Sequence, residues 1–220
     1  MTANERPLWT VFERAVSALG LVALSPVLAA AAIGVVVSDG FPVLFRQQRV
    51  GRFGKPFELL KFRSMRKSNK GPLVTGAHDA RITGVGRILR KYKLDELPQL
   101  WNVVRGDMSL IGPRPEVLRF VEAEDPTWRR VLSVRPGITD LASLVYRNEE
   151  DELRGAADPE ATYRERILPR KLELNLRGIE QRSFYNDIRL ILMTIRSSFF
   201  GSAFEPARIE AAFATGARKD

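Results

Sequence analysis

The chain has 220 residues, of which 45% are apolar and 28% charged, as expected for one folded domain with a sizeable core. It contains no cysteine and a single histidine, His78, which excludes disulfides, thiolate metal sites and cysteine nucleophiles, and Ser/His catalysis unless His78 is the base. The formal net charge is +9, so anionic partners have to be considered.

The positive charge is concentrated in one segment. From Arg46 to Glu116 there are 16 Lys and Arg against 6 Asp and Glu, a net +10, so the rest of the chain is about neutral. Such an excess suits nucleic acid, anionic lipid headgroups or a phosphorylated substrate. No aromatic-basic surface motif or recognisable binding module accompanies it, so we expect no nucleic-acid partner.

Near the N-terminus, Ala15 to Val37 carry no formal charge, and these 23 residues predict a membrane segment. As a straight helix they would reach about 35 Å, enough for a hydrocarbon core of about 30 Å. No short basic region and no clear cleavage box frame the run, which argues against a cleaved signal peptide.

Within this run, Ser25 and Pro26 predict a kink, because proline removes a helical hydrogen bond and clashes with the preceding turn. Arg14 lies before the run and Arg46 after it, which favours both ends on the cytoplasmic side. The pattern therefore allows a re-entrant helix that enters and leaves by one face. An ordinary spanning helix with a tolerated proline fits the residues equally well.

From Phe41 to Met65, short apolar runs surround a turn-rich stretch with Gly51 and Pro56, which predicts a β-hairpin. Residues Ser68 to Asp79, which include His78, are expected to form a polar loop.

Two helices are predicted next. Apolar residues at helical spacing from Ile82 to Tyr92, with basic residues interleaved, indicate an amphipathic basic helix. The second helix runs through Leu97 to Val104, with Asp95 as its expected N-cap, Pro98 in its first turn and Gly106 as its stop.

The remaining chain alternates turns and helices. Gly112 to Pro115 and Arg135 to Gly137 read as rigid turns, and Glu149 to Glu152 with Asp158-Pro159 as a surface loop. Helices are predicted over about Ala161 to Ile179 and Asp187 to Phe199. From Gly201 onward the pattern is too mixed for a prediction.

Asp95 and Glu96 are the first candidates for chemistry. A helix N-terminus stabilises charged carboxylates and also attracts a phosphate, so a nucleophile and its substrate could meet there. Acidic residues in a first helical turn are also ordinary capping residues, so the pair alone carries little weight.

Several other charged residues could support such a site. Cations in or near stiff turns are suited to phosphate oxygens, because a fixed guanidinium can make a bidentate contact; they are Lys61, Arg63, Arg114, Arg135 and Arg147. Asp107 and Asp187 could help to hold a hard cation such as Mg²⁺, although capping explains Asp187 equally well.

Three blocks of sequence, taken together, carry a family resemblance. KFRSM (Lys61 to Met65), RITGVGRILRKYKLDELPQLWNVVRGDMSLIGPRPE (Arg81 to Glu116) and VRPGIT (Val134 to Thr139) resemble the bacterial sugar transferases, small monotopic phosphoglycosyl transferases. The resemblance covers about Phe12 to Phe200. Ser25-Pro26 is similar to the break in that family's re-entrant membrane helix.

The resemblance implies that the chain is an enzyme that moves a sugar-1-phosphate from a UDP-sugar to undecaprenyl (polyprenol) phosphate. Asp95 would attack the β-phosphate, release UMP and form a phosphosugar-aspartate, from which the polyprenol phosphate takes the phosphosugar. Glu96 would be associated with Mg²⁺. This is the first membrane step of bacterial glycoconjugate assembly, such as that of exopolysaccharide or O-antigen.

The same resemblance implies that Lys61, Arg114 and Arg147 contact phosphate or nucleotide, and that Asp187 lies near the site. Many family members continue after RPGIT with GWAQVNGRN, whereas this chain has Asp140 to Glu150 with the sequence DLASLVYRNEE. Nucleotide or sugar contacts from this segment are therefore expected to differ, and the motifs leave the sugar open.

We thus expect a mainly helical α+β protein with a re-entrant N-terminal helix, a small β-hairpin and amphipathic interfacial helices. The expected divisions are a membrane-inserted segment 1–40, a cytoplasmic catalytic domain 41–200 and a C-terminal tail 201–220. The expected location is the cytoplasmic face of the bacterial inner membrane, in contact with membrane lipids. The alternative is a non-catalytic membrane scaffold whose basic region binds anionic lipid. The sequence predicts no oligomeric state.

Overall fold

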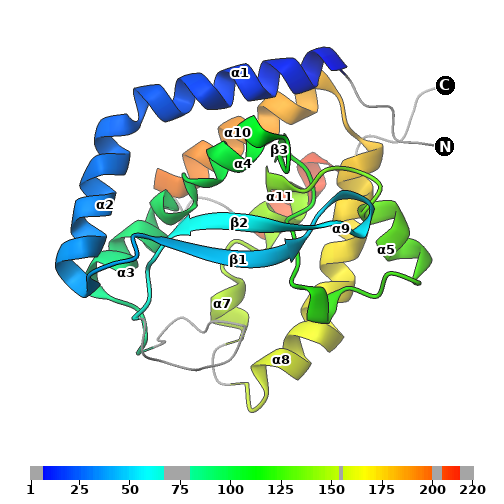
Figure 1. The fold of residues 1–220 in the computed structure, drawn as a ribbon. Helices are drawn as coiled ribbons and strands as arrows, with labels where there is room; N and C mark the ends of the chain where they lie inside the picture. Colours follow the sequence, from blue (N-terminus) through cyan, green and yellow to red (C-terminus); the bar gives the residue numbers. More distant parts are fainter. Residues whose placement is uncertain (1–6, 67–79, 154–155, 200–204, 214–220) are drawn as a thin grey trace.

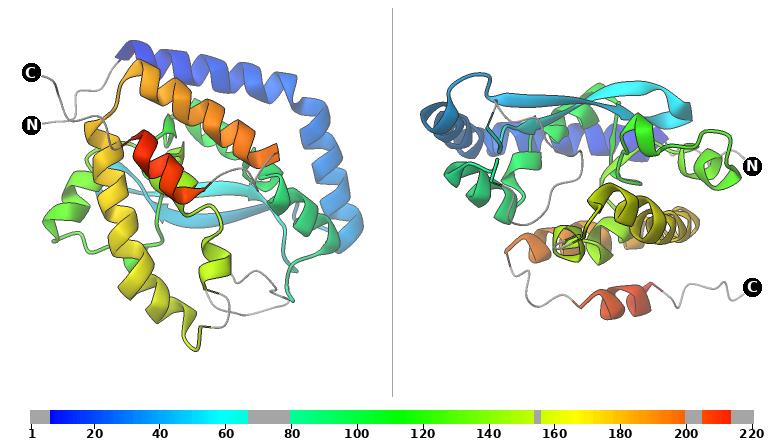
Figure 2. Two further views of the ribbon diagram at one scale, coloured as in Figure 1. Left: turned by 180° about the vertical axis from the view of Figure 1, so that it is seen from behind. Right: turned by 90° about the horizontal axis from the view of Figure 1, so that it is seen from below.

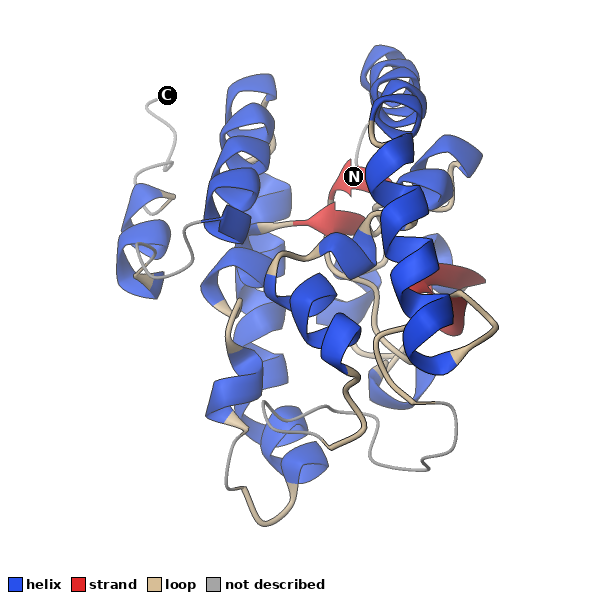
Figure 3. Ribbon diagram, turned by 90° about the vertical axis from the view of Figure 1, so that its left-hand side faces the viewer, coloured by secondary structure: helices blue, strands red, loops and turns tan. Residues whose placement is uncertain are grey.

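The computed structural model describes residues 7–66, 80–153, 156–199 and 205–213. Helices dominate, and two small two-stranded sheets lie among them (Figures 1 and 3). The α+β class is therefore confirmed. The loop predicted at Ser68 to Asp79, with His78, lies outside the described residues.

In chain order the first half contains α1 (Pro7–Ala23), α2 (Ser25–Asp39), β1 (Leu44–Val50), a 3₁₀ turn (Arg52–Gly54), β2 (Pro56–Phe62), α3 (Gly84–Lys91), a 3₁₀ turn (Leu94–Glu96), α4 (Gln99–Arg105) and β3 (Ser109–Ile111). The second half contains a 3₁₀ turn (Leu118–Phe120), α5 (Pro126–Val131), β4 (Gly137–Thr139), α6 (Leu141–Val145), α7 (Glu149–Glu152), α8 (Pro159–Thr162), a π-helical turn (Tyr163–Ile167), α9 (Leu168–Glu180), α10 (Phe184–Phe199) and α11 (Pro206–Ala212).

The apolar N-terminal run forms two helices, α1 and α2, which meet at Leu24 with a bend of 63°. The predicted kink at Ser25 and Pro26 is therefore confirmed, since Pro26 lies in the first turn of α2, where its missing N–H costs little. Neither α1 nor α2 is by itself long and apolar enough to cross a bilayer, and the same holds for every other described helix. The bent pair together reaches that length and composition.

Helix α1 crosses the top of Figure 1 and packs along α4 and β3. The side that it buries carries the polar residues Glu13 and Ser17 together with Trp9. Glu13 is 1% exposed and accepts hydrogen bonds from the Ser109 hydroxyl and from the backbone N–H of Leu110, the latter at 3.0 Å. Arg14 donates to the carbonyl of Arg105 at 2.7 Å. The opposite face carries exposed apolar side chains, namely Leu8, Val11, Phe12, Val16, Leu19 and Val22.

Helix α2 packs on the other end of the domain. Ala31 and Val35 are buried against Phe62 of β2 and Leu89 of α3. Both halves of the bent pair therefore rest on the same domain.

The predicted hairpin is confirmed as the antiparallel pair β1 and β2, with Leu44 opposite Phe62 and Val50 opposite Pro56. A second pair, β3 and β4, is parallel and was not predicted, because three-residue strands leave no periodic pattern. These strands bring the two proline-framed turns together. A Cβ on Gly137 would lie 2.1 Å from the backbone nitrogen of Gly112, so no side chain fits at this crossing.

The acidic stretch predicted as a surface loop is the short helix α7. The prediction was wrong because the apolar residue that ends the stretch, Leu153, is 3% exposed and packs with Phe120 and Trp128. Asp158 caps the next helix, where its carboxylate accepts from the N–H of Ala161 at 3.0 Å.

The C-terminal half forms a layer of helices that covers the sheet β3–β4 from behind, as the rear view in Figure 2 shows. Its core is formed by α6, α9 and α10. Helix α11 lies beyond Gly201, where the pattern was too mixed for a prediction. Ile209 and Phe213 are 3% and 5% exposed and join this core, so residues 205–213 are part of the fold.

We expect Glu13→Leu to lower the free energy of unfolding by about 2 kcal/mol, because the Ser109 hydroxyl and the Leu110 N–H would stay buried without an acceptor. Urea denaturation in detergent measures the change. Glu124→Leu is the matched control, since the Glu124 side chain is 95% exposed. Equal stability of the two variants would contradict a structural contribution from the buried carboxylate.

Candidate functional site

Asp95 and Glu96 lie in the 3₁₀ turn between α3 and α4. The turn follows Lys93, whose φ of 56° is left-handed and reverses the chain after α3. Asp95 is not the N-cap of α4, so this prediction was wrong. The chain first closes 3₁₀ bonds, with the N–H of Leu97 donating to the carbonyl of Leu94, and Pro98 cannot donate, so α4 begins only at Gln99.

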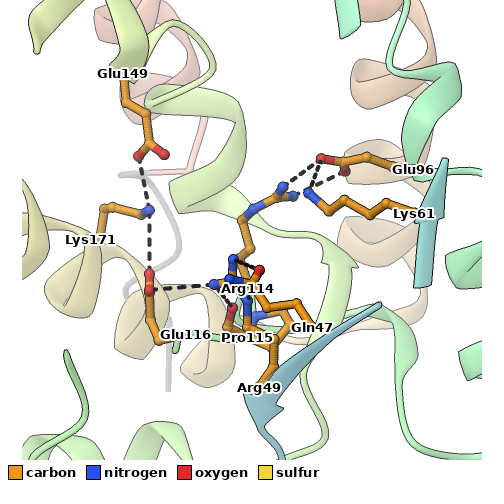
Figure 4. Close-up of polar contacts among 9 residues, drawn as sticks. All are labelled: Gln47, Arg49, Lys61, Glu96, Arg114, Pro115, Glu116, Glu149 and Lys171. Atoms are coloured by element: carbon orange, nitrogen blue, oxygen red, sulfur yellow. Dashed lines mark hydrogen bonds and ion pairs between the residues drawn. The ribbon is translucent and has the colours of Figure 1, made fainter. Parts of the chain in front are cut away.

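Glu96 is held by two cations from distant parts of the chain. Lys61 of β2 donates to its Oε1 at 3.1 Å, and Arg114 contacts both carboxylate oxygens, at 3.1 and 2.5 Å (Figure 4). Burial alone would raise the pKa of Glu96, but Arg114 and then Lys61 hold that pKa well below its usual range. Glu96 is therefore an anion that fixes two cations side by side.

Asp95 has a different environment, although it is the next residue along the chain. It is 5% exposed, and no donor among the described residues reaches its Oδ1 atom. Burial, followed by the charge of Glu96, raises the pKa of Asp95, and Lys61 and Lys93 offset part of the rise. The two carboxylates are thus shifted in opposite directions, which separates their chemical roles.

The two cations are themselves perturbed. Burial lowers the pKa of Lys61 from 10.5 to about 8, with Glu96 opposing this shift. Glu96 raises the pKa of Arg114, which is therefore charged at any physiological pH. The arrangement offers a phosphate one permanent cation and one that titrates slightly above neutrality.

A second charged cluster adjoins Arg114 and was missed from the sequence (Figure 4). Its centre is Lys171 of α9, which is 5% exposed and contacts Glu149 at 3.0 Å, the Tyr163 hydroxyl at 3.1 Å and Glu116 at 3.7 Å. Arg49 pairs with Glu116 at 3.8 Å. A signal was present, since Lys171 lies three residues from the buried Leu168 and Leu174, on the apolar face of its helix.

This second cluster is joined to the first through the proline-framed turn. Arg49 donates to the carbonyl of Pro115 at 2.9 Å and pairs with Glu116, while Arg114 points the other way to Glu96. Neighbouring residues of one short turn are thus anchored on opposite sides. The guanidinium of Arg114 is held in a fixed position by both anchors.

Three predicted phosphate-binding arginines make contacts away from Glu96. Arg63 is 7% exposed and donates to the carbonyls of Asp39 and Gly40 at 2.7 and 2.6 Å, which fixes the end of α2 on the hairpin. Arg135 donates to Thr10 of α1. Arg147 donates to Ser197 of α10 at 2.8 Å. Of the predicted cations, the structure brings only Lys61 and Arg114 to the dyad.

The candidate acidic ligands are also engaged elsewhere. Asp107 pairs with Arg105 at 3.3 Å, and Asp187 is buried and pairs with Arg182 at 3.4 Å. Asp187 is in the first turn of α10, whose opposite end contacts Tyr92 near the dyad through Phe199. Twelve helical residues span about 18 Å, so Asp187 lies far from that end of the helix.

The dyad itself is compatible with a magnesium ion. Within the described part of the chain, no three His, Cys, Asp or Glu side chains gather as a metal site. Mg²⁺ is commonly held by one or two carboxylates, with water and substrate phosphate completing its octahedron. Asp95 with its unpartnered Oδ1 and the adjacent Glu96 fit that donor set.

Comparison with known proteins shows the family to which the chain belongs. A family model described as bacterial sugar transferase matches residues 4–201, so the chain belongs to the bacterial sugar transferase family. A UDP-glucose:undecaprenyl-phosphate glucose-1-phosphate transferase of Caulobacter vibrioides is 38% identical over 85% of this chain and 68% of its own length.

Other relatives are longer. A protein of the same description from Escherichia coli is 36% identical over 83% of this chain and 38% of its own length. The UDP-N-acetylgalactosamine-undecaprenyl-phosphate N-acetylgalactosaminephosphotransferase of Aeromonas hydrophila is 36% identical over 89% and 45%, respectively. The chain thus spans less than half of these two proteins.

The lowered pKa of Lys61 predicts a pH dependence for anion binding. The ammonium loses its proton as pH rises through about 8, so pyrophosphate affinity should fall about fivefold from pH 8 to 9. In Lys61→Arg the cation stays charged, and the fall should disappear. Calorimetric titration from pH 6.5 to 9.5 measures both profiles, with the exposed Lys55→Arg as control. A flat wild-type profile would remove Lys61 from the anion site.

Proposed function

We propose that the protein is a phosphoglycosyl transferase that moves a sugar-1-phosphate from a UDP-sugar to undecaprenyl phosphate through a covalent intermediate on Asp95. The observation that carries this proposal is the contrast within the dyad. Glu96 is neutralised by Lys61 and Arg114, whereas Asp95 is buried beside them with an oxygen that has no partner among the described residues. Such an oxygen is suited to attack a phosphorus atom.

In the first step, an Asp95 oxygen forms a bond to the β-phosphorus of the donor, and the bond from that phosphorus to the bridging oxygen breaks. The bridging oxygen leaves with UMP. Negative charge grows on the phosphoryl oxygens and on the leaving group, and Arg114 and Lys61 are placed to stabilise it. Both cations are already aligned by Glu96, so little reorganisation is needed.

In the second step, an oxygen of the polyprenol phosphate attacks the same phosphorus. The phosphorus–oxygen bond to Asp95 breaks, which restores the carboxylate and yields a polyprenol diphosphosugar. The charge of the phosphoryl group is again offset by Arg114 and Lys61. No base is required in either step, because the attacking groups are anions, and this is consistent with a chain that has a single histidine.

The proposal includes Mg²⁺, which Asp95 and Glu96 would hold together with the donor phosphates. When bound, the ion would polarise the phosphoryl oxygens and add to the charge stabilisation. In the ligand-free protein, Arg114 and Lys61 perform the same neutralisation of Glu96.

The relatives support the choice of substrates. The Caulobacter and Aeromonas proteins are described as transferases that use undecaprenyl phosphate, one with UDP-glucose and the other with UDP-N-acetylgalactosamine. We extend the acceptor and the class of UDP-hexose donors to this chain. Such a lipid product would belong to the first membrane step of glycoconjugate assembly, at the cytoplasmic face of the inner membrane.

We also propose that α1 and α2 enter the membrane as a re-entrant pair. The start of α1 is tied to the domain by Arg135 through Thr10, and the end of α2 is tied to it by Arg63 through Asp39. Both ends therefore belong to one folded body, which supports a placement of both on one side of the bilayer. The exposed apolar face of α1 would then face the lipid.

We expect Asp95→Asn to abolish UMP release, with a loss of at least about 10⁴-fold, because an amide is a far weaker nucleophile than a carboxylate. The wild-type enzyme incubated with UDP-sugar and no acceptor should gain the mass of one phosphosugar on the Asp95 peptide. Glu122→Gln provides a matched acid-to-amide control outside the dyad.

An adduct that persists in Asp95→Asn would remove Asp95 from the nucleophile role. Strong vesicle binding with no UMP release from any of a panel of UDP-sugars, with Mg²⁺ and undecaprenyl phosphate present, would favour the membrane scaffold instead.

The re-entrant arrangement predicts that both ends of the helix pair are accessible from the cytoplasm. Because the chain has no cysteine, single cysteines at Ala3 and Phe41 report cleanly. A membrane-impermeant maleimide should label both in inverted vesicles and neither in intact spheroplasts. Pro26→Ala should straighten the bend and shift a fraction of molecules toward a spanning topology. Labelling of Ala3→Cys in spheroplasts of the otherwise native chain would contradict the arrangement.

A further inference from the structure

Glu149, the first residue of α7, is the most accessible of the acidic groups around the site. Its side chain is 29% exposed, against 11% for both Glu96 and Glu116. Its Oε2 accepts from Lys171 at 3.0 Å. No donor among the described residues reaches its Oε1, so half of this carboxylate is held and the other half can accept a hydrogen bond.

The charge of Glu149 is stabilised by cations of the site. Burial alone would raise the pKa of Glu149, but Lys171, Arg114 and Lys93 lower it, so the group is an anion at neutral pH. The same charge raises the pKa of Arg114. Glu149 therefore belongs to the charged network that contains Arg114.

No hydrogen bond or ion pair joins Glu149 to Arg114 in the described structure, although both belong to the charged network around the dyad. Figure 4 shows Glu149 and Lys171 on one side, Lys61 and Glu96 on the other, and Arg114 between them. If Arg114 and Lys61 hold the phosphate, the sugar attached to that phosphate would extend toward one of these sides. Glu149 offers the accessible acceptor on the side away from Lys61.

Lys171 holds Glu149 in place through only one of its two carboxylate oxygens. The buried ammonium also donates to the Tyr163 hydroxyl and lies within ion-pair distance of Glu116, at 3.7 Å, so its charge is shared among three oxygen partners. It needs one oxygen of Glu149 and leaves the other. Lys171 is thus a positioning residue for Glu149.

We propose that Glu149 recognises the sugar of the donor. Its free carboxylate oxygen accepts a hydrogen bond from a ring hydroxyl or an acetamido N–H of the transferred phosphosugar. This inference deepens the proposed transferase function and rests on it.

The test measures donor preference, which a purely structural residue would not change. The full-length enzyme in nanodiscs is assayed for kcat/KM of UMP release with UDP-glucose, UDP-galactose and their N-acetylated forms. Glu149→Gln should change the ratio between the best and the second donor by about 10- to 100-fold, since a hydrogen bond to a charged group is lost.

Glu152→Gln is the matched control, because Glu152 is exposed on the same helix α7. Glu149→Asp keeps the charge for Lys171 and withdraws the oxygens from the sugar, so it gives the same test if the glutamine variant does not fold. A uniform loss with every donor, or an unchanged ratio, would overturn the assignment.

Failure of the wider function would look different. A wild-type enzyme that releases no UMP from any donor would refute the transferase proposal. The affinities of UDP-sugars relative to UDP would still test Glu149, because loss of sugar recognition should bring the two affinities together in Glu149→Gln. Equal differences in the variant and the wild type would overturn it.

Discussion

The ion-paired carboxylate of Glu96 is the contact through which the candidate site is assembled. It joins three segments that are remote in sequence: the end of the hairpin through Lys61, the 3₁₀ turn that carries the dyad, and the proline-framed turn through Arg114. A buried carboxylate with two cations is stable only while its partners are complete, because removal of one partner leaves an uncompensated charge. The three segments are therefore fixed relative to one another before any substrate arrives.

This constraint also separates the roles of adjacent residues. Lys61 and Arg114 pair with Glu96, whereas the adjacent Asp95 is buried and its Oδ1 atom has no hydrogen-bond partner among the described residues. The second cluster, around Lys171, continues the alternation of charge from Glu116 to Glu149. Arg114 lies where the two clusters meet: Glu96 pairs with its guanidinium, and Arg49 holds the backbone of the turn that carries it. Such preorganised cations lower the cost of stabilising phosphoryl charge.

The sequence predicted the elements that have a hydrophobic periodicity or that are bounded by proline or glycine. The kink, the hairpin, the helices on either side of the dyad and the last long helices all left such signals, and Lys61 and Arg114 were found through their place in a strand and a stiff turn. The three-residue strands β3 and β4 left no such signal, and neither did the acidic helix α7, which is followed by the buried Leu153. The other arginines show a different limit, because composition predicts a cation but not its partner. Arg63, Arg135 and Arg147 are engaged by α2, α1 and α10, which only the tertiary structure brings near.

Under the proposed re-entrant arrangement, the polar residues of α1 have a consequence for how the helix would enter a membrane. Glu13 is bonded to Ser109 and Leu110, residues that are synthesised almost a hundred positions later. Before those residues exist, a nascent α1 in lipid would carry an unpaired carboxylate, at a cost of about 2.5 to 3.5 kcal/mol at the bilayer centre. Early insertion of the isolated helix would therefore be disfavoured until the β3 strand is there to receive it. A single side chain would then link membrane entry in time to completion of the domain.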